Sequence, residues 1–256
     1  MDSKSQPFEE QLAQALRENA ELRKGLEESE RALAASQAAA DELQRFFYAA
    51  THDLRQPLRT IACYAQLLQK QYALDESTSE LTAFIAGSAH EMNTLIDDLL
   101  KYSRTGESLR RSMVNLASVV QWAMMNLQTA IRECGAQIVY EDLPELPIDE
   151  SLFVQVFQHL FSNALKFRSA ETPRIEITAQ EEAQACTISV RDNGQGIEPR
   201  FQEQVFQPFK RLHGKQIPGS GLGLALCRKI IEVHGGKIRI ESDGEHGSVF
   251  RFTVPF

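Results

Sequence analysis

The spacing of apolar residues changes once along the chain, and this change limits the folds that the sequence can adopt. Residues 8–50 contain no proline and a single glycine, and they are rich in residues that favour helix. Further on, apolar residues recur at intervals of three and four up to Tyr102. From about Val114 the chain instead shows short strand-like runs interspersed with helical segments. The sequence therefore predicts a helical part followed by a separate α+β part.

The first helical segment, residues 1–45, carries a thin heptad seam. With Leu12 at position a, Asn19 also falls at a, whereas Ser29 and Ser36 fall at d and weaken the seam. We predict a coiled-coil signalling helix here, with a solvated single helix as the alternative. The same register places His52 at an outward f position, where a partner can reach it.

Residues 46–108 are expected to form a helical hairpin with its break at residues 73–79. The second helix has an apolar stripe made of Leu81, Phe84, Ile85, Ser88, Met92, Leu95, Leu99 and Tyr102. Two helices cannot bury stripes of this width by themselves. A homodimer that forms a four-helix bundle is therefore predicted.

Composition argues against several classes of function. The formal net charge is -8 with scattered Lys and Arg, so nucleic acid is not an expected partner. Four distant cysteines without a CxxC pair indicate neither a zinc site nor a disulfide framework, and they fit a reducing, cytoplasmic setting. Residues 112–131 lack formal charge but contain four side-chain amides, so we predict a buried or amphipathic helix and no membrane span.

One helical segment, residues 149–167, combines an apolar face with a polar stripe of Gln155, His159, Asn163 and Lys166. An amide oxygen can ligate Mg²⁺, and an ammonium group can meet phosphate as a point charge. The alternative is an ordinary solvated helix face.

Two glycine-containing segments follow. In VRDNGQGI, residues 190–197, two glycines after Asp192 would let backbone approach a ligand while the carboxylate accepts a hydrogen bond from an amino group. A hairpin turn is the alternative. Residues 218–236 begin with closely spaced glycines at a helix start, where free N–H groups favour phosphate. A Rossmann dinucleotide site is rejected because no hydrophobic strand directly precedes Gly219.

Five segments, taken in order, resemble the sequence boxes of sensor histidine kinases of two-component systems. They are HDLRQPL (H box), HLFSNALKF (N box), DNGQGI (G1 box), VFQPFKRLH (F box) and GSGLGLALCRKIIEVHGG (G2 box). The resemblance covers roughly residues 45–256, and the H box is most similar to that of phytochrome-like kinases. It implies a multidomain fold: a dimeric helical phosphoacceptor (HisKA) domain over residues 46–108, and an α+β two-layer sandwich of the Bergerat type (HATPase_c) over residues 112–256.

The resemblance also implies roles for individual residues. His52 would be the phosphoacceptor, Asp53 its helper, Asn163 the Mg²⁺ ligand and Asp192 the acceptor for the adenine amino group. Further ATP-binding residues would be Lys166, Gly194, Gly196, Phe209, Gly219, Gly221 and Gly223, with a lid over residues 198–220.

The activity implied is autophosphorylation of His52 from ATP and Mg²⁺, followed by transfer to an aspartate of a separate response regulator. Two alternatives are an ATPase or serine kinase on the same fold, and a non-catalytic scaffold. Two positions depart from the family pattern. His159 stands where many members have Asn, and Gln56 stands where Thr or Asn is common and is tied to phosphatase activity, so we expect that activity to be weak or altered. The chain has no recognisable sensor domain.

Overall fold

The computed structural model divides the chain into two units, residues 1–52 and residues 53–256. The residues that it describes are 19, 23–26, 51, 54–70, 75–212 and 219–256. Those of the first unit are helical. The rest of the predicted coiled coil, together with His52 and Asp53, lies outside the described residues.

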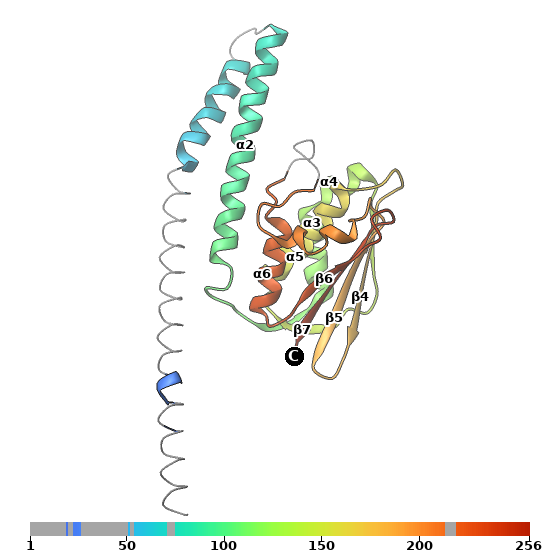
Figure 1. The fold of residues 1–256 in the computed structure, drawn as a ribbon. Helices are drawn as coiled ribbons and strands as arrows, with labels where there is room; N and C mark the ends of the chain where they lie inside the picture. The colour runs from blue at the N-terminus through green and yellow to red at the C-terminus, as the bar shows by residue number, and fades with distance from the viewer. Residues whose placement is uncertain (1–18, 20–22, 27–50, 52–53, 71–74, 213–218) are drawn as a thin grey trace, which may run out of the picture. The chain divides into compact units, whose positions relative to one another are not determined.

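Residues 54–70 form a helix that runs antiparallel to α2 (Glu76–Arg104) (Figure 1). An ion pair joins Arg55 to Asp97, and near the other end the Gln69 side chain donates to the carbonyl of Ser79. Helix α2 begins earlier than expected, because the Asp75 carboxylate accepts the N–H of Thr78 at 2.8 Å and caps it. The predicted break at residues 73–79 is therefore wrong at its C-terminal half.

The wide apolar stripe of α2 is largely uncovered within this hairpin. Phe84 and Leu81 are 76% and 61% exposed, whereas the residues buried on this helix include Thr82, Ala89 and Ile96. The large side chains in the first half of the stripe, Leu81, Phe84, Ile85 and Met92, thus remain exposed.

The C-terminal part is a two-layer α/β sandwich, which confirms the predicted fold class. Its elements are β1 (Ser112–Asn115), α3 (Leu116–Asn126), α4 (Gln128–Cys134), β2 (Gln137–Tyr140), β3 (Glu145–Ile148), α5 (Glu150–Lys166), β4 (Arg174–Glu181), β5 (Ala185–Asp192), η1 (Pro199–Phe201), η2 (Gln204–Phe206), α6 (Gly223–Val233), β6 (Ile238–Glu241) and β7 (Ser248–Pro255). The main sheet has the order β2-β4-β5-β7-β6, with only the β2–β4 pair parallel, and β1 pairs with β3 separately. Helices α3, α5 and α6 form the second layer over one face of the sheet (Figure 1).

Helix α5 is the centre of the core. Phe153, Phe157 and Phe161, spaced four residues apart, are fully buried. The ring of Phe157 lies 6.1 Å from that of Phe252 on β7. Burying one such ring contributes roughly 1.5–3 kcal/mol. Because this face is fixed against the sheet, the opposite face of α5 is held in a defined orientation.

The start of α5 is fixed by a buried polar junction. Asp149 caps the helix by accepting the N–H of Leu152, and it also accepts the N–H of Arg110 from the segment before β1. The N–H of Asp149 donates to Nε2 of His234 at 3.0 Å, and Nδ1 of this histidine lies 2.7 Å from the carbonyl of Ile230. The imidazole is 1% exposed and accepts at one nitrogen, so it is in its neutral form. This junction connects the end of α6 to the start of α5.

The strand-like runs of the sequence, at residues 136–141, 173–180, 185–192, 237–242 and 247–254, form β2, β4, β5, β6 and β7. The prediction of a single helix over residues 112–131 is wrong. Residues 112–115 form β1, and the carboxamide of Asn115 accepts the N–H groups of Ala117 and Ser118, which starts α3 there. A second break at Leu127 separates α3 from α4. Across the described part of the chain, no helix is both long and apolar enough to span a membrane.

Candidate nucleotide-binding site

A cavity of about 350 Å³ opens between α5, the segment after β5, β7 and the start of α6. This volume lies within the range of small-molecule binding sites. Its lining is Thr94, Asp98, His159, Ser162, Asn163, Ala164, Lys166, Phe167, Asp192, Gln195, Gly196, Ile197, Val205, Lys210, Arg211, Leu212, Gly219, Ser220, Gly221, Gly223, Leu224, Ser248 and Phe250. Sequence motifs far apart in the chain thus meet around one space.

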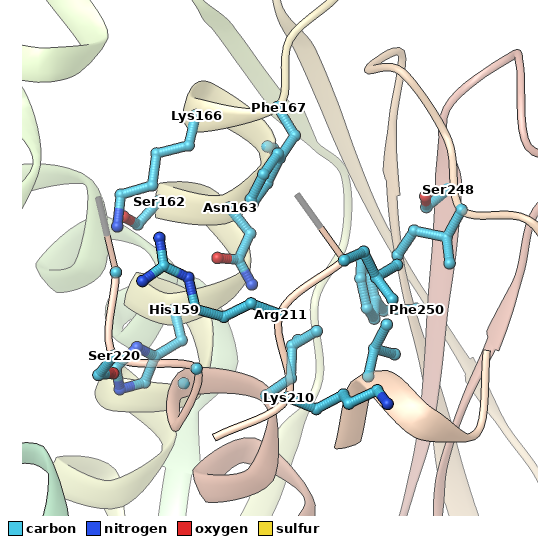
Figure 2. Close-up of a pocket in the computed structure, with 18 of the residues that line it drawn as sticks. His159, Ser162, Asn163, Lys166, Phe167, Lys210, Arg211, Ser220, Ser248 and Phe250 are labelled. Atoms are coloured by element: carbon cyan, nitrogen blue, oxygen red, sulfur yellow. The ribbon is translucent and has the colours of Figure 1, made fainter. Parts of the chain in front are cut away.

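The polar face of α5 supplies one end of the cavity. Figure 2 shows His159, Ser162, Asn163 and Lys166 on successive turns, with Arg211 extending toward them. The carboxamide of Asn163 forms no hydrogen bond with another described residue. Lysine and arginine next to an unpaired amide form a donor set suited to phosphate oxygens and a hard cation.

The other end contains an acid surrounded by apolar groups. Asp192 ends β5, pairs in register with Ser248 of β7, and accepts the N–H of Gly194 at 2.9 Å. Burial raises the pKa of its carboxyl above the ordinary value, although hydrogen bonds from the N–H groups of Gly194 and Ser248 oppose this. Ser248 and Phe250 lie opposite the α5 side chains in Figure 2. An acceptor beside apolar walls suits a flat heterocycle that carries an amino group.

The start of α6 forms the floor of the cavity at its cationic end. The helix begins at Gly223, and its N-cap, Leu222, provides no side-chain hydrogen bond. Its uncapped N–H groups and positive dipole end favour an anion. Gly221 has φ +71, which strains any residue with a Cβ, and a Cβ there would also lie only 3.1 Å from the Cα of Phe209.

His159 packs directly on this helix start. A Cβ on Gly223 would lie 3.0 Å from Nδ1 of His159. Burial lowers the pKa of the imidazole, which keeps it neutral at neutral pH; the carboxylate of Asp98 acts in the opposite direction. Neither ring nitrogen forms a hydrogen bond with another described residue.

Not every residue singled out in the sequence lines the cavity. Gly194 lies behind Asp192, where a Cβ would be 2.6 Å from the carbonyl oxygen of Phe167. Phe209 is 57% exposed and its N–H donates to the carbonyl of Gly221. Gln155, on the predicted polar stripe, instead donates to the carbonyl of Ser151.

Other predicted residues belong to the helical part or to the predicted lid. Gln56 is exposed on the helix 54–70, and its carbonyl accepts the hydroxyl of Thr60. His52 and Asp53 lie outside the described residues, as does the middle of the predicted lid, residues 213–218. The lid segment before this gap contains η1 and η2, with Val205 and Phe206 buried.

The cavity fits ATP with Mg²⁺ by the chemistry of its donors. Asp192 offers a carboxylate acceptor at the apolar end, whereas Asn163 offers an oxygen ligand at the cationic end. Lys166, Lys210 and Arg211 supply positive charge for phosphates. Among the described residues no three His, Cys, Asp or Glu side chains converge as a metal site, so a cation here would depend on ligands from the nucleotide.

These features define a class of protein: a phosphoacceptor-type helical hairpin joined to a Bergerat-type ATP-binding domain. Residues 148–256 match the family described as histidine kinase-, DNA gyrase B- and HSP90-like ATPase, and residues 42–108 match the His Kinase A (phospho-acceptor) domain. Together the two matches cover more than half of the chain. The chain belongs to the sensor histidine kinases, with a relationship to the phytochrome-like members.

Individual relatives agree with this assignment. Over 218 residues, or 84% of this chain, it is 41% identical to cyanobacterial phytochrome A of Nostoc sp. and 39% identical to the phytochrome-like protein Cph1 of Synechocystis sp.. It spans 28% and 29% of those two proteins, so it corresponds to less than a third of their length.

Solved structures have a similar fold. The histidine kinase ThkA in complex with the response regulator protein TrrA superposes with a TM-score of 0.59 at 25% identity, covering 82% of this chain and 61% of that one. Full-length ShkA in complex with AMPPNP has a TM-score of 0.67 at 24% identity, covering 83% of this chain and 46% of that one, and supports the fold.

Proposed function

We propose that the chain acts as a protein-histidine kinase in two-component signalling: it phosphorylates His52 from ATP and passes the phosphoryl group to an aspartate of a response regulator. The observation that carries the proposal is one cavity with Asp192 at an apolar end and Asn163 with Lys166 at a cationic end. This cavity belongs to a chain whose residues 42–108 match a phospho-acceptor domain.

Each end of the cavity has its own task in this reaction. The Asp192 carboxylate accepts a hydrogen bond from the adenine amino group, while Lys166 and Arg211 hold the phosphates by charge. Asn163 would ligate Mg²⁺, which when bound neutralises charge on the transferring group. Positioning of this kind accounts for most of the catalysis of phosphoryl transfer.

The chemical step joins the two parts of the chain. A neutral nitrogen of His52 attacks the γ-phosphorus in line, the N–P bond forms as the bond to the ADP oxygen breaks, and the ring proton leaves to a base. Asp53, the neighbouring residue, is proposed to orient the imidazole or accept that proton. The phosphoryl group then moves from nitrogen to a carboxylate oxygen of the regulator.

Further parts of the proposal concern assembly and the reverse activity. The uncovered stripe that includes Phe84 and Leu81 supports a homodimer through a four-helix bundle. We place the protein in the cytoplasm, where ATP is available. Gln56 is proposed to give weak or altered phosphatase activity; dephosphorylation of the regulator at an ordinary rate, lost in Gln56→Ala, would contradict this.

The central test is phosphorylation with γ-labelled ATP and Mg²⁺. Acid-labile, base-stable label is expected in the parent and in His90→Ala, which removes an exposed histidine of α2, but not in His52→Ala. Label that persists in His52→Ala would refute the assigned phosphoacceptor. Nucleotide binding without any label would favour the alternative of a non-catalytic scaffold.

A further inference from the structure

His159 is a cavity-lining side chain whose role the family pattern leaves open. It lies one turn before Asn163 on α5, and Figure 2 shows the two residues on the same side of this helix. Both line the cavity. Residues four apart on a helix are neighbours, so an imidazole and a carboxamide are presented together to whatever occupies the space.

The imidazole of His159 is held in place, but no described protein group forms a hydrogen bond with its nitrogens. The closeness of Nδ1 to the helix start leaves no room for a side chain at Gly223, so the ring packs against backbone. Neither of its nitrogens forms a hydrogen bond with another described residue. These nitrogens are not among the described side-chain atoms that are both buried and unpartnered, so they remain open to a ligand that enters the cavity.

The nearby side chains narrow the choice of ligand. Asp98, Lys101 and Lys166 all lie close enough to influence His159 electrostatically. The only carboxylate among them, that of Asp98, accepts the hydroxyl of Ser220 at 2.6 Å. The protein offers no set of three metal-binding side chains among the described residues. A metal ion can therefore be held here only together with oxygen ligands from bound nucleotide.

We propose that His159 and Asn163 both ligate the divalent ion that enters with the nucleotide, and that the imidazole makes this site prefer Mn²⁺ to Mg²⁺. Mg²⁺ demands oxygen ligands, whereas Mn²⁺, although it also takes oxygen ligands, is a first-row transition metal and accepts an imidazole nitrogen more readily than Mg²⁺ does. An asparagine in place of His159 would offer oxygen instead. The proposal rests on the proposed function and specifies its metal.

The direct test is pulsed electron paramagnetic resonance of the full chain with Mn²⁺ and the non-hydrolysable analogue AMPPNP. A directly bound imidazole nitrogen gives strong ¹⁴N modulation, distinct from the weaker modulation of the unligated bridging nitrogen of AMPPNP, and we expect this strong modulation in the parent and not in His159→Asn. Titration calorimetry supplies the second readout. The ratio of Mn²⁺·AMPPNP affinity to Mg²⁺·AMPPNP affinity should fall at least roughly tenfold in the variant, the lower end of what disturbing a metal site usually costs.

Each outcome decides the matter. A parent spectrum without this strong nitrogen modulation overturns the proposal whether or not the variant folds, and so does an unchanged affinity ratio in a variant that binds metal-free ADP normally. If His159→Asn fails to bind metal-free ADP, His159→Gln replaces it in both measurements. Loss of the proposed function is separable, because a chain that labels His52 with neither metal can still show strong nitrogen modulation.

Discussion

Replacing Asp192 by asparagine should weaken nucleotide binding without lowering the stability of the protein. The carboxamide oxygen can still accept the N–H of Gly194, which now lies at 2.9 Å from Oδ1. The second carboxylate oxygen is replaced by an NH₂ group, so a donor faces the amino group of adenine. One hydrogen bond to a charged group is lost, worth about 1.5–3 kcal/mol.

That loss corresponds to roughly 10- to 150-fold weaker binding of ADP. Stability of the nucleotide-free protein should be unchanged or higher, because burial raises the pKa of Asp192 and its ionised form is therefore unfavourable in the folded state. The folded protein binds a proton on Asp192 more tightly than the unfolded protein does. Ionisation of this carboxyl at a pH above its ordinary pKa therefore lowers the free energy of unfolding, and asparagine, which does not ionise, removes this loss.

Calorimetric titration with ADP and a thermal unfolding scan at pH 7 measure the two quantities. Glu245→Gln, on an exposed loop, is a matched control for loss of one negative charge and should change neither. Binding within about threefold of the parent would refute the role of Asp192 in base recognition. A lower unfolding midpoint together with weaker binding would instead indicate that Asp192 mainly supports the fold.

Three further changes test other parts of the structure. Gly236→Ala would place a Cβ 1.8 Å from a backbone carbonyl oxygen of β7, so it should lower the free energy of unfolding in denaturant by about 2 kcal/mol or more. Gly219→Ala is the control, because no described atom lies within 4 Å of its Cβ, and it should leave the denaturant midpoint unchanged. Burial lowers the pKa of His234 below its ordinary 6.5, so the unfolded state takes up a proton first as the pH decreases. The contribution of His234 to stability should be constant above that pH and fall below it, by at most about 1.4 kcal/mol per pH unit. A difference between the parent and His234→Gln that does not change with pH would refute this. Phe84→Glu should convert the dimer to a monomer in sedimentation velocity, whereas Met113→Glu, at an exposed position on β1, should not. If Phe84→Glu remains a dimer, the apolar stripe of α2 is not the interface.

The sequence predicted the elements whose hydrophobic pattern matches the burial of their side chains in the fold. The alternating run of β5 matches a strand in the middle of a sheet with one face under helices, and it was located at its correct bounds. Strands β1 and β3 were missed because four residues are too few to establish a period of two. Residues 112–131 were assigned to one helix because apolar composition alone does not reveal where a side chain such as Asn115 caps a helix.

The candidate site was predictable where a polar residue interrupts an apolar pattern. Asn163 and Asp192 stand out in this way, and both line the cavity. Ser248 and Phe250 do not, because they look like ordinary strand residues and reach the cavity only through the pairing of β7 with β5. Such positions depend on sheet register, which connects segments more than fifty residues apart and leaves no local signal.

The strand order has a consequence for how this domain is made. Strand β7 comes last in sequence among the described strands, yet it lies between β5 and β6 and hydrogen-bonds to both. When the ribosome has synthesised the chain through residue 241, β6 cannot yet join the other strands, because β7 must lie between it and β5. Asp192 also lacks its neighbour Ser248 until the final strand emerges. Folding of the ATP-binding domain should consequently be late during synthesis, and a nascent chain stopped before residue 248 should bind no nucleotide and remain exposed to proteases.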